Sequence, residues 1–126
     1  MKTEILTKNS PAPIGPYAQA IDAGGFLFCS GQIPLDPETG VVVGEGDVEM
    51  QTAQVMKNIS AVLTQAGVNF SHVVKTTIFL KDMGMFPKVN AIYAKSFSAP
   101  FPARSTVEVA RLPKDVLVEI EVIVKK

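Results

Sequence analysis

The sequence predicts an α+β domain in which two helices cover one face of a β-sheet. Residues 48–66 and 85–97 carry apolar side chains at helical spacing. The segments around them read as strands, in the order strand, strand, strand, helix, strand, helix, strand, strand. We expect the 126 residues to form a single domain over residues 1–126, because a chain of this length can bury roughly two-thirds of its unfolded surface.

The region before the first helix combines a proline-rich loop with short strands. Residues 10–16 contain three prolines, which cannot donate to a sheet, so an ordered surface loop is expected there. Residues 17–21 and 26–30 flank the turn sequence Asp-Ala-Gly-Gly, which predicts a hairpin. Residues 34–40 are predicted as a loop and residues 41–43 as a short strand.

The two predicted helices have recognisable ends. Asp47 has the side chain of an N-cap for the first helix, and Gly67 is placed to end it. Residues 73–80 are rich in β-branched side chains and predict a strand between the helices. The second helix, over residues 85–97, is followed by two prolines that cannot continue it.

The last two strands, residues 104–110 and 116–124, are predicted to form an antiparallel hairpin around a turn at residues 112–115. In the final strand, every second residue from Val116 to Val124 is valine or isoleucine. Side chains alternate between the two faces of a strand, so this wholly apolar face should pack against the helices.

The strand before it alternates too, and its valines are assigned to the helix-covered face. Arg104 and Thr106 then point away from the helices. One allowed register places Thr106 opposite Glu119 and Arg104 opposite Glu121. The pattern therefore predicts an arginine and two carboxylates together on the sheet face away from the helices.

This predicted cluster has two chemical interpretations. The guanidinium of Arg104 matches the two oxygens of a substrate carboxylate, and a glutamate on a partly apolar face could hold or activate a water. Alternatively, Arg104 forms a structural salt bridge with Glu119 or Glu121, and the glutamates are ordinary surface residues. The pattern does not choose between Glu119 and Glu121 as the reactive carboxylate.

The charge and hydropathy patterns disfavour nucleic acid and membranes as partners. Twelve basic and 12 acidic residues give a formal net charge of zero, and no basic run stands out. No apolar run approaches the ~18 residues that a membrane span needs, and the first residues lack the apolar core of a signal peptide. The single cysteine, Cys29, cannot form an intramolecular disulfide, so we expect a cytoplasmic protein.

Metal and cofactor sites lack their usual motifs. With one histidine and one cysteine, a zinc site would need mainly carboxylates, and no glycine-rich phosphate loop precedes either helix. Ser30 lacks the flanking glycines of a nucleophile elbow, Cys29 is expected to be buried and inert, and His72 to lie on the surface. The sequence predicts neither a metal nor a cofactor.

Six separated segments carry recognisable motifs, namely residues 11–17 (PAPIGPY), 29–34 (CSGQIP), 89–93 (VNAIY), 101–105 (FPARS), 107–115 (VEVARLPKD) and 118–121 (VEIE). In their order and spacing they resemble the Rid family, also called YjgF, and in particular its RidA subgroup, which has the arginine. The match covers nearly the whole chain.

The resemblance implies a mixed β-sheet with two helices on one face, in the fold of the small trimeric chorismate mutases. It also implies a homotrimer whose three sheets form a central barrel, with active sites in the clefts between subunits. The implied activity is that of a 2-iminobutanoate/2-iminopropanoate deaminase. Such an enzyme hydrolyses imino or enamine acids, made by pyridoxal-phosphate dehydratases, to 2-keto acids and ammonia without a cofactor.

The resemblance also implies roles for individual residues. Arg104 would bind the substrate carboxylate, and Glu119 would position or activate the hydrolytic water. The backbone at Thr106, where many relatives have cysteine, would contribute a main-chain group. The rest of the pocket would be formed by Tyr17, Ser30, Gly31, Asn90 and Pro113.

Two other functions are described for relatives of this kind. One is a translation inhibitor with endoribonuclease activity, which the balanced charge and the lack of an aromatic stacking platform disfavour. The other is a non-enzymatic trimer that binds metabolites or acts like a chaperone. Ligand binding alone would need Arg104 but could dispense with Glu119.

Overall fold

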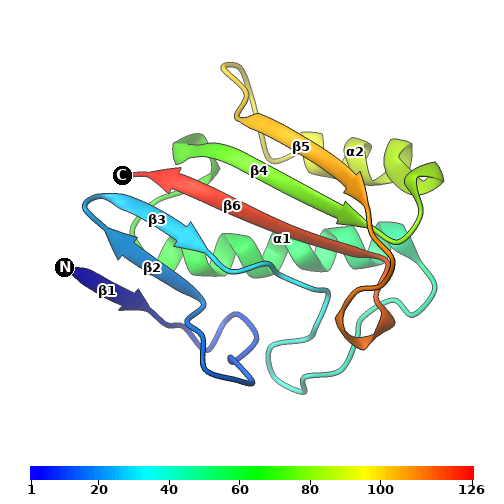
Figure 1. Cartoon of the computed structure of the whole chain (residues 1–126), viewed down its shortest axis with the longest axis horizontal. Helices are drawn as coiled ribbons and strands as arrows, with labels where there is room; N and C mark the ends of the chain where they lie inside the picture. Colours follow the sequence, from blue (N-terminus) through cyan, green and yellow to red (C-terminus); the bar gives the residue numbers. More distant parts are fainter.

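A computed structural model describes residues 1–126 and contains one six-stranded sheet in the order β1-β2-β3-β6-β4-β5 (Figure 1). Neighbouring strands are antiparallel except β4 and β5, which run parallel, so the predicted mixed sheet is confirmed. The strands are β1 (Lys2–Ile5), β2 (Ala20–Ala23), β3 (Phe26–Cys29), β4 (Val73–Leu80), β5 (Ala103–Glu108) and β6 (Val118–Lys125).

Two helices, α1 (Val48–Gln65) and α2 (Phe86–Ala94), lie on the same face of the sheet, behind it in Figure 1, as predicted. Asp47 caps α1, since its side chain accepts hydrogen bonds from the backbone N–H groups of Glu49 (3.0 Å) and Met50 (3.1 Å). No helix has both the length and the apolar composition that crossing a bilayer requires. Short 3-10 turns cover Phe70–His72, Met83–Met85 and Pro113–Asp115.

The core lies between the sheet and α1, and β6 runs through its centre. The alternate side chains from Val116 to Val124 are at most 2 % exposed, which confirms the predicted apolar face of this strand. All of them except Val116 belong to one buried cluster with Val55 and Ile59 of α1 and with Ile78 of β4. Burial of these side chains supplies much of the driving force for packing the helix on the sheet.

The N-terminal part of the sheet differs from the sequence prediction in three places. The hairpin turn contains only Gly24 and Gly25, both with positive φ (64° and 86°), so β2 extends to Ala23. Strand β1 has no counterpart in the prediction, because its residues are mostly polar and lie exposed at the sheet edge. The predicted strand at residues 41–43 is wrong, since only an isolated bridge forms there.

The predicted hairpin of the last two strands is also wrong, because β4 lies between β5 and β6. Strand β4, helix α2 and strand β5 form a crossover unit, whose two strands run parallel. Strand β6 then pairs with the other edge of β4 in the antiparallel direction. The register that joined Thr106 to Glu119 and Arg104 to Glu121 therefore does not occur.

This strand order places Arg104 and Glu119 on opposite faces of the sheet, which corrects the predicted cluster. Directly paired residues share a face. Arg104 pairs with Thr76, which is fully buried, so Arg104 lies on the face that the helices cover. Glu119 pairs with Phe79 on the open face. Val107 misled the prediction, because an edge strand need not bury its apolar side chains: this residue is 40 % exposed.

We expect Ile120→Ala to lower the free energy of unfolding by about 2–5 kcal/mol, because the side chain is fully buried and its loss leaves a cavity. Urea unfolding at one fixed protein concentration measures this. The control is Val74→Ala, at an exposed position of β4, which should change stability by less than about 0.5 kcal/mol. Equal losses in the two variants would contradict the core described above.

Candidate active site

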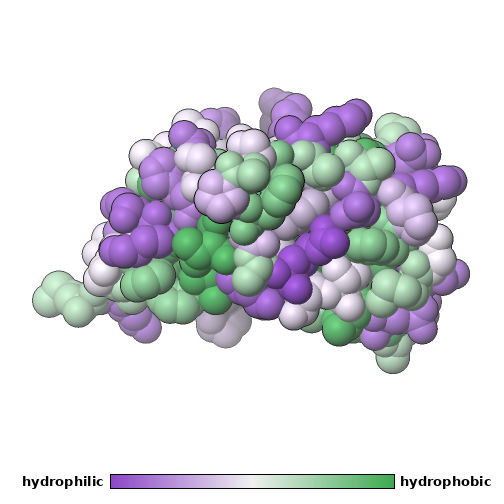
Figure 2. Space-filling model, turned by 90° about the horizontal axis from the view of Figure 1, so that it is seen from above, coloured by the Kyte–Doolittle hydropathy of each residue, from purple (hydrophilic) through white to green (hydrophobic).

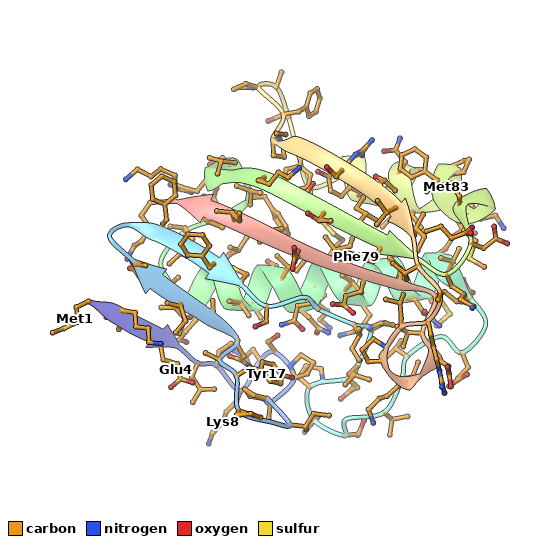
Figure 3. The ribbon with its side chains drawn as sticks, in the orientation of Figure 1. Met1, Glu4, Lys8, Tyr17, Phe79 and Met83 are labelled. Carbon is orange, nitrogen blue, oxygen red and sulfur yellow. The ribbon has the colours of Figure 1, made fainter.

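A cavity of about 380 Å³ lies where the proline-rich loop, the end of β3 and the Pro113–Asp115 turn meet. We refer to it as the Glu119 cavity. Figure 3 marks Tyr17, one of its lining residues, in the loop before β2. Five residues expected in the site line it together: Tyr17, Ser30, Gly31, Pro113 and Glu119. The other lining residues are Pro11, Ala12, Ile14, Gln19, Gln32, Ile33, Leu35 and Lys114.

Glu119 is a half-buried carboxylate without an ion-pair partner. The two ion pairs of the structure join Arg111 to Asp115 and Lys126 to Asp22. Burial raises the pKa of Glu119 above its usual value of 4.5, and the charge of the neighbouring Glu121 raises it further. A carboxylate with a raised pKa is a better proton acceptor than an exposed one, which suits it to activating a water.

Gly31 makes room for the Glu119 side chain. A Cβ atom at this position would overlap the Glu119 carboxyl group. The backbone here cannot move away, because Gln32 and Ile120 exchange two hydrogen bonds: the N–H of Gln32 donates to Ile120 (2.9 Å), and the N–H of Ile120 donates to Gln32 (3.2 Å). Any larger residue at this position would therefore have to displace the Glu119 carboxyl group from its place in the cavity.

The sequence prediction missed Gln19, a buried residue that fixes the proline-rich loop beside the cavity. Its Oε1 accepts a hydrogen bond from the N–H of Thr7 (2.8 Å). Its Nε2 donates to the carbonyl oxygens of Thr7 (3.0 Å), Ser10 (3.2 Å) and Pro11 (2.9 Å). The hydroxyl of Ser30 donates to the carbonyl that precedes Gln19 (2.6 Å). A glutamine next to an apolar strand segment is the one sequence signal for this role.

The turn that closes the other side of the cavity has unusual backbone conformation. Lys114 and Asp115 have φ values of 55° and 56°, in the left-handed region that residues other than glycine seldom occupy. The guanidinium of Arg111 bonds the Asp115 carboxylate (2.6 Å) and holds the pKa of that group below its usual range. This conformation brings Pro113 and Lys114 to the cavity wall. Such backbone strain is often found at functional sites.

Arg104 lines a second hollow, of about 450 Å³, between β5 and the end of α2. Its Nη1 donates to Oδ1 of Asn90 (2.7 Å), and its Cζ lies 5.1 Å from the ring centroids of both Phe86 and Tyr93. The β5 edge, seen from above in Figure 2, presents green apolar groups directly beside purple polar ones. We refer to this second hollow as the Arg104 hollow. It is lined by Asn90, Tyr93, Ala94, Phe97, Phe101, Pro102 and Arg104.

One chain therefore divides the expected site residues between two places. Asn90 and Arg104 share the second hollow, apart from the five residues of the Glu119 cavity. Thr106 lines neither and pairs with Ile78 on the helix-covered face. The alternative of a salt bridge between Arg104 and a glutamate is wrong, because Asn90 is the partner of Arg104 and neither ion pair of the structure includes it.

The remaining reactive side chains have structural surroundings. Burial raises the pKa of the Cys29 thiol to about 12, which leaves it protonated and inert at neutral pH. His72 accepts a hydrogen bond through Nδ1 from the N–H of Asn69 (3.2 Å) and so completes a capping box. The fold brings together no group of three or more histidine, cysteine, aspartate or glutamate side chains that could hold a metal ion.

Comparison with known proteins identifies the family of the chain. The family model described as endoribonuclease L-PSP matches residues 7–126. The crystal structure of the Rid family protein YyfA from Yersinia pestis, described as a protein of unknown function, superposes with a TM-score of 0.97 and 56% identity over 100% of both chains. The chain belongs to the Rid family.

Two further relatives carry chemical information, one in its name and one in its bound ligand. This Rid protein is 51% identical over 126 residues to the 2-iminobutanoate/2-iminopropanoate deaminase of Salmonella typhimurium, covering 98% of this chain and 97% of the relative. The crystal structure of Escherichia coli TdcF with bound serine superposes with a TM-score of 0.92 and 40% identity over 98% of both chains.

The raised pKa of Glu119 predicts how Glu119→Gln changes stability with pH. The folded chain holds this proton more tightly than the unfolded chain, so wild-type stability falls as the pH rises from the usual value of 4.5 through the folded value. Above that interval the cost of burying the charge is fully present. Glutamine avoids this cost, so the Tm of Glu119→Gln should rise relative to that of the wild type as the pH is raised above 4.5. A difference that stays constant or shrinks would contradict the burial of an ionisable carboxyl.

Proposed function

We propose that this Rid protein hydrolyses small 2-imino acids, such as 2-iminobutanoate and 2-iminopropanoate, to 2-oxo acids and ammonia. The observation that supports this most is the pairing of complementary groups in two hollows: a half-buried carboxylate with raised pKa in one and a guanidinium in the other. A 2-imino acid presents both features that such groups recognise, namely a carboxylate and an electrophilic carbon. The name of the Salmonella relative supports the same chemistry.

The proposed site is completed by a second copy of the chain. Within one chain, Arg104 and Glu119 lie on opposite faces of the sheet, so one small substrate cannot contact both. In a closed ring of identical subunits, the Arg104 hollow of one copy can face the Glu119 cavity of the next at every interface. We propose a homotrimer of this kind, with exposed Phe28 and Val107 of the open face among the covered residues.

The proposed reaction needs only water and the two side chains. Arg104 binds the substrate carboxylate and keeps one N–H on Asn90. Glu119 takes a proton from water as the oxygen attacks the carbon of the protonated C=NH2+ bond, which gives a neutral carbinolamine. Return of the proton to nitrogen makes ammonia the leaving group; the C–N bond breaks, and loss of the hydroxyl proton leaves the 2-oxo acid. Free imines already hydrolyse in water, so orientation and modest electrostatic help suffice.

Endoribonuclease activity, which the family description names, has less support from the site. The formal net charge is zero, and the only histidine is engaged in a local capping box. Neither hollow contains a histidine that could exchange protons with a ribose hydroxyl.

We expect Arg104→Ala to reduce imine hydrolysis by at least roughly 100-fold, since it removes a charge-assisted anchor and the orientation that the anchor gives. Arg104→Lys should recover little, because an ammonium group lacks the planar fork. Glu119→Gln should depress turnover but spare binding of 2-oxobutanoate. The measurements are keto-acid formation from imine made by threonine dehydratase, ligand affinity and Tm. Near-normal turnover in Arg104→Ala would refute the proposed mechanism.

Mixed assemblies test whether two chains build each site. The Arg104→Ala and Glu119→Gln chains are unfolded in urea, combined in equal amounts and refolded together. Random assembly in a trimer puts an intact Arg104 next to an intact Glu119 at about one interface in four, so about a quarter of wild-type activity should return.

The control for this experiment is the same two variants refolded separately and then mixed, which should stay inactive. Light scattering should give a mass about three times the 13.5 kDa of one chain. A site built within one chain predicts no recovery in any mixture. A monomer at micromolar concentration would exclude the intersubunit site.

A further inference from the structure

One face of α2 contacts the side chain of Arg104, which is otherwise exposed. Phe86, Asn90 and Tyr93 follow each other at intervals of four and three residues, which places them on the same side of the helix. All three reach Arg104: Asn90 by a hydrogen bond of 2.7 Å, and the two rings with their centroids 5.1 Å from its Cζ. A guanidinium near two aromatic rings is held both by cation–π attraction and by their shape.

Tyr93 is itself fixed from two other directions. Its hydroxyl lies 2.8 Å from Oγ1 of Thr76, and both residues are buried. The ring of Phe97 packs against it with a centroid distance of 4.6 Å and an angle of 37°. Thr76 is also the residue that pairs directly with Arg104 across the two parallel strands. The hydroxyl pair therefore links the helix to the strand position next to the arginine.

We propose that Tyr93, anchored by Thr76, is a positioning residue for Arg104. Its ring restricts the guanidinium to one orientation, in which one N–H is bonded to Asn90 and the others remain available to a carboxylate. The two aromatic rings favour arginine over lysine at position 104, because an ammonium group has no plane to align with them. This inference rests on the proposed function for its consequence in catalysis, but the placement of Arg104 can be measured without turnover.

Three variants separate the hydroxyl from the ring. Tyr93→Phe keeps the ring and loses the hydrogen bond to Thr76. Thr76→Val removes the same hydrogen bond from the other side, with almost no change in shape. Tyr93→Leu removes the ring. The first readout is the NMR signal of the Arg104 Nε–H group, identified by its absence in Arg104→Lys. The wild-type signal should carry a ring-current shift. This shift should change slightly in Tyr93→Phe and Thr76→Val and fall in Tyr93→Leu to the part that the Phe86 ring contributes.

The second readout is the affinity for 2-oxobutanoate, measured by calorimetry with Tm for each variant. Tyr93→Leu should weaken binding about 10-fold, and Tyr93→Phe and Thr76→Val about threefold each, without adding in the double variant because they remove one hydrogen bond. In an Arg104→Ala background, Tyr93→Leu should cause no further loss, whereas a merely structural Tyr93 would lower Tm and affinity in both backgrounds.

An Arg104 signal that is unchanged in Tyr93→Leu would overturn the inference, as would a further loss of affinity in the Arg104→Ala background. If Tyr93→Leu does not fold, Tyr93→Phe and Thr76→Val decide by the same signal. A wild-type protein that shows no imine hydrolysis would refute the proposed function, yet the ring-current shift would still report whether Tyr93 positions Arg104.

Discussion

The burial of the apolar side of β6 is the constraint on which the rest of the structure depends. Because side chains alternate along a strand, turning Val118 and Ile120 toward α1 forces Glu119 to the opposite face. Strand β6 pairs with β3 on one side and β4 on the other, so it cannot rotate to relieve the burial of a carboxylate. The packing of the core therefore holds Glu119 in its half-buried position, and this burial raises its pKa.

Arg104 owes its position to a different kind of restraint. It lies on edge strand β5, which has one hydrogen-bonded neighbour and no core on its outer side. Helix α2 supplies the restraint that the sheet does not, since Asn90 and two aromatic rings contact the guanidinium from one side. The two charged groups of the proposed site therefore belong to two separate supports, one made by the strand at the centre of the sheet and one by the crossover helix.

The sequence predicted those features that have a local periodic signature and failed where distant segments compete. The Asp47 cap, both helices and the buried face of β6 follow from spacing within one element. The partner of β5 does not, because the hairpin and the crossover are both compatible with its alternation, and the wrong choice moved Arg104 to the wrong face. Motif resemblance placed eight residues in one site, of which only five share a cavity within one chain: Tyr17, Ser30, Gly31, Pro113 and Glu119. Gln19 escaped notice because its partners are backbone groups, which no side-chain pattern reveals.

The wall of the Glu119 cavity depends on one atom, the amide nitrogen of Gln19. The amide nitrogen donates to three carbonyl oxygens from Thr7, Ser10 and Pro11. Hydrolysis of the amide, or a glutamate in its place, would put a charged oxygen against those three acceptors with almost no change in volume. Repulsion would then replace attraction at each of these three carbonyl contacts, and the loop that carries Tyr17 would keep only the bond from the N–H of Thr7. Deamidation of Gln19 would thus disrupt the wall of the Glu119 cavity and leave the hydrophobic core intact.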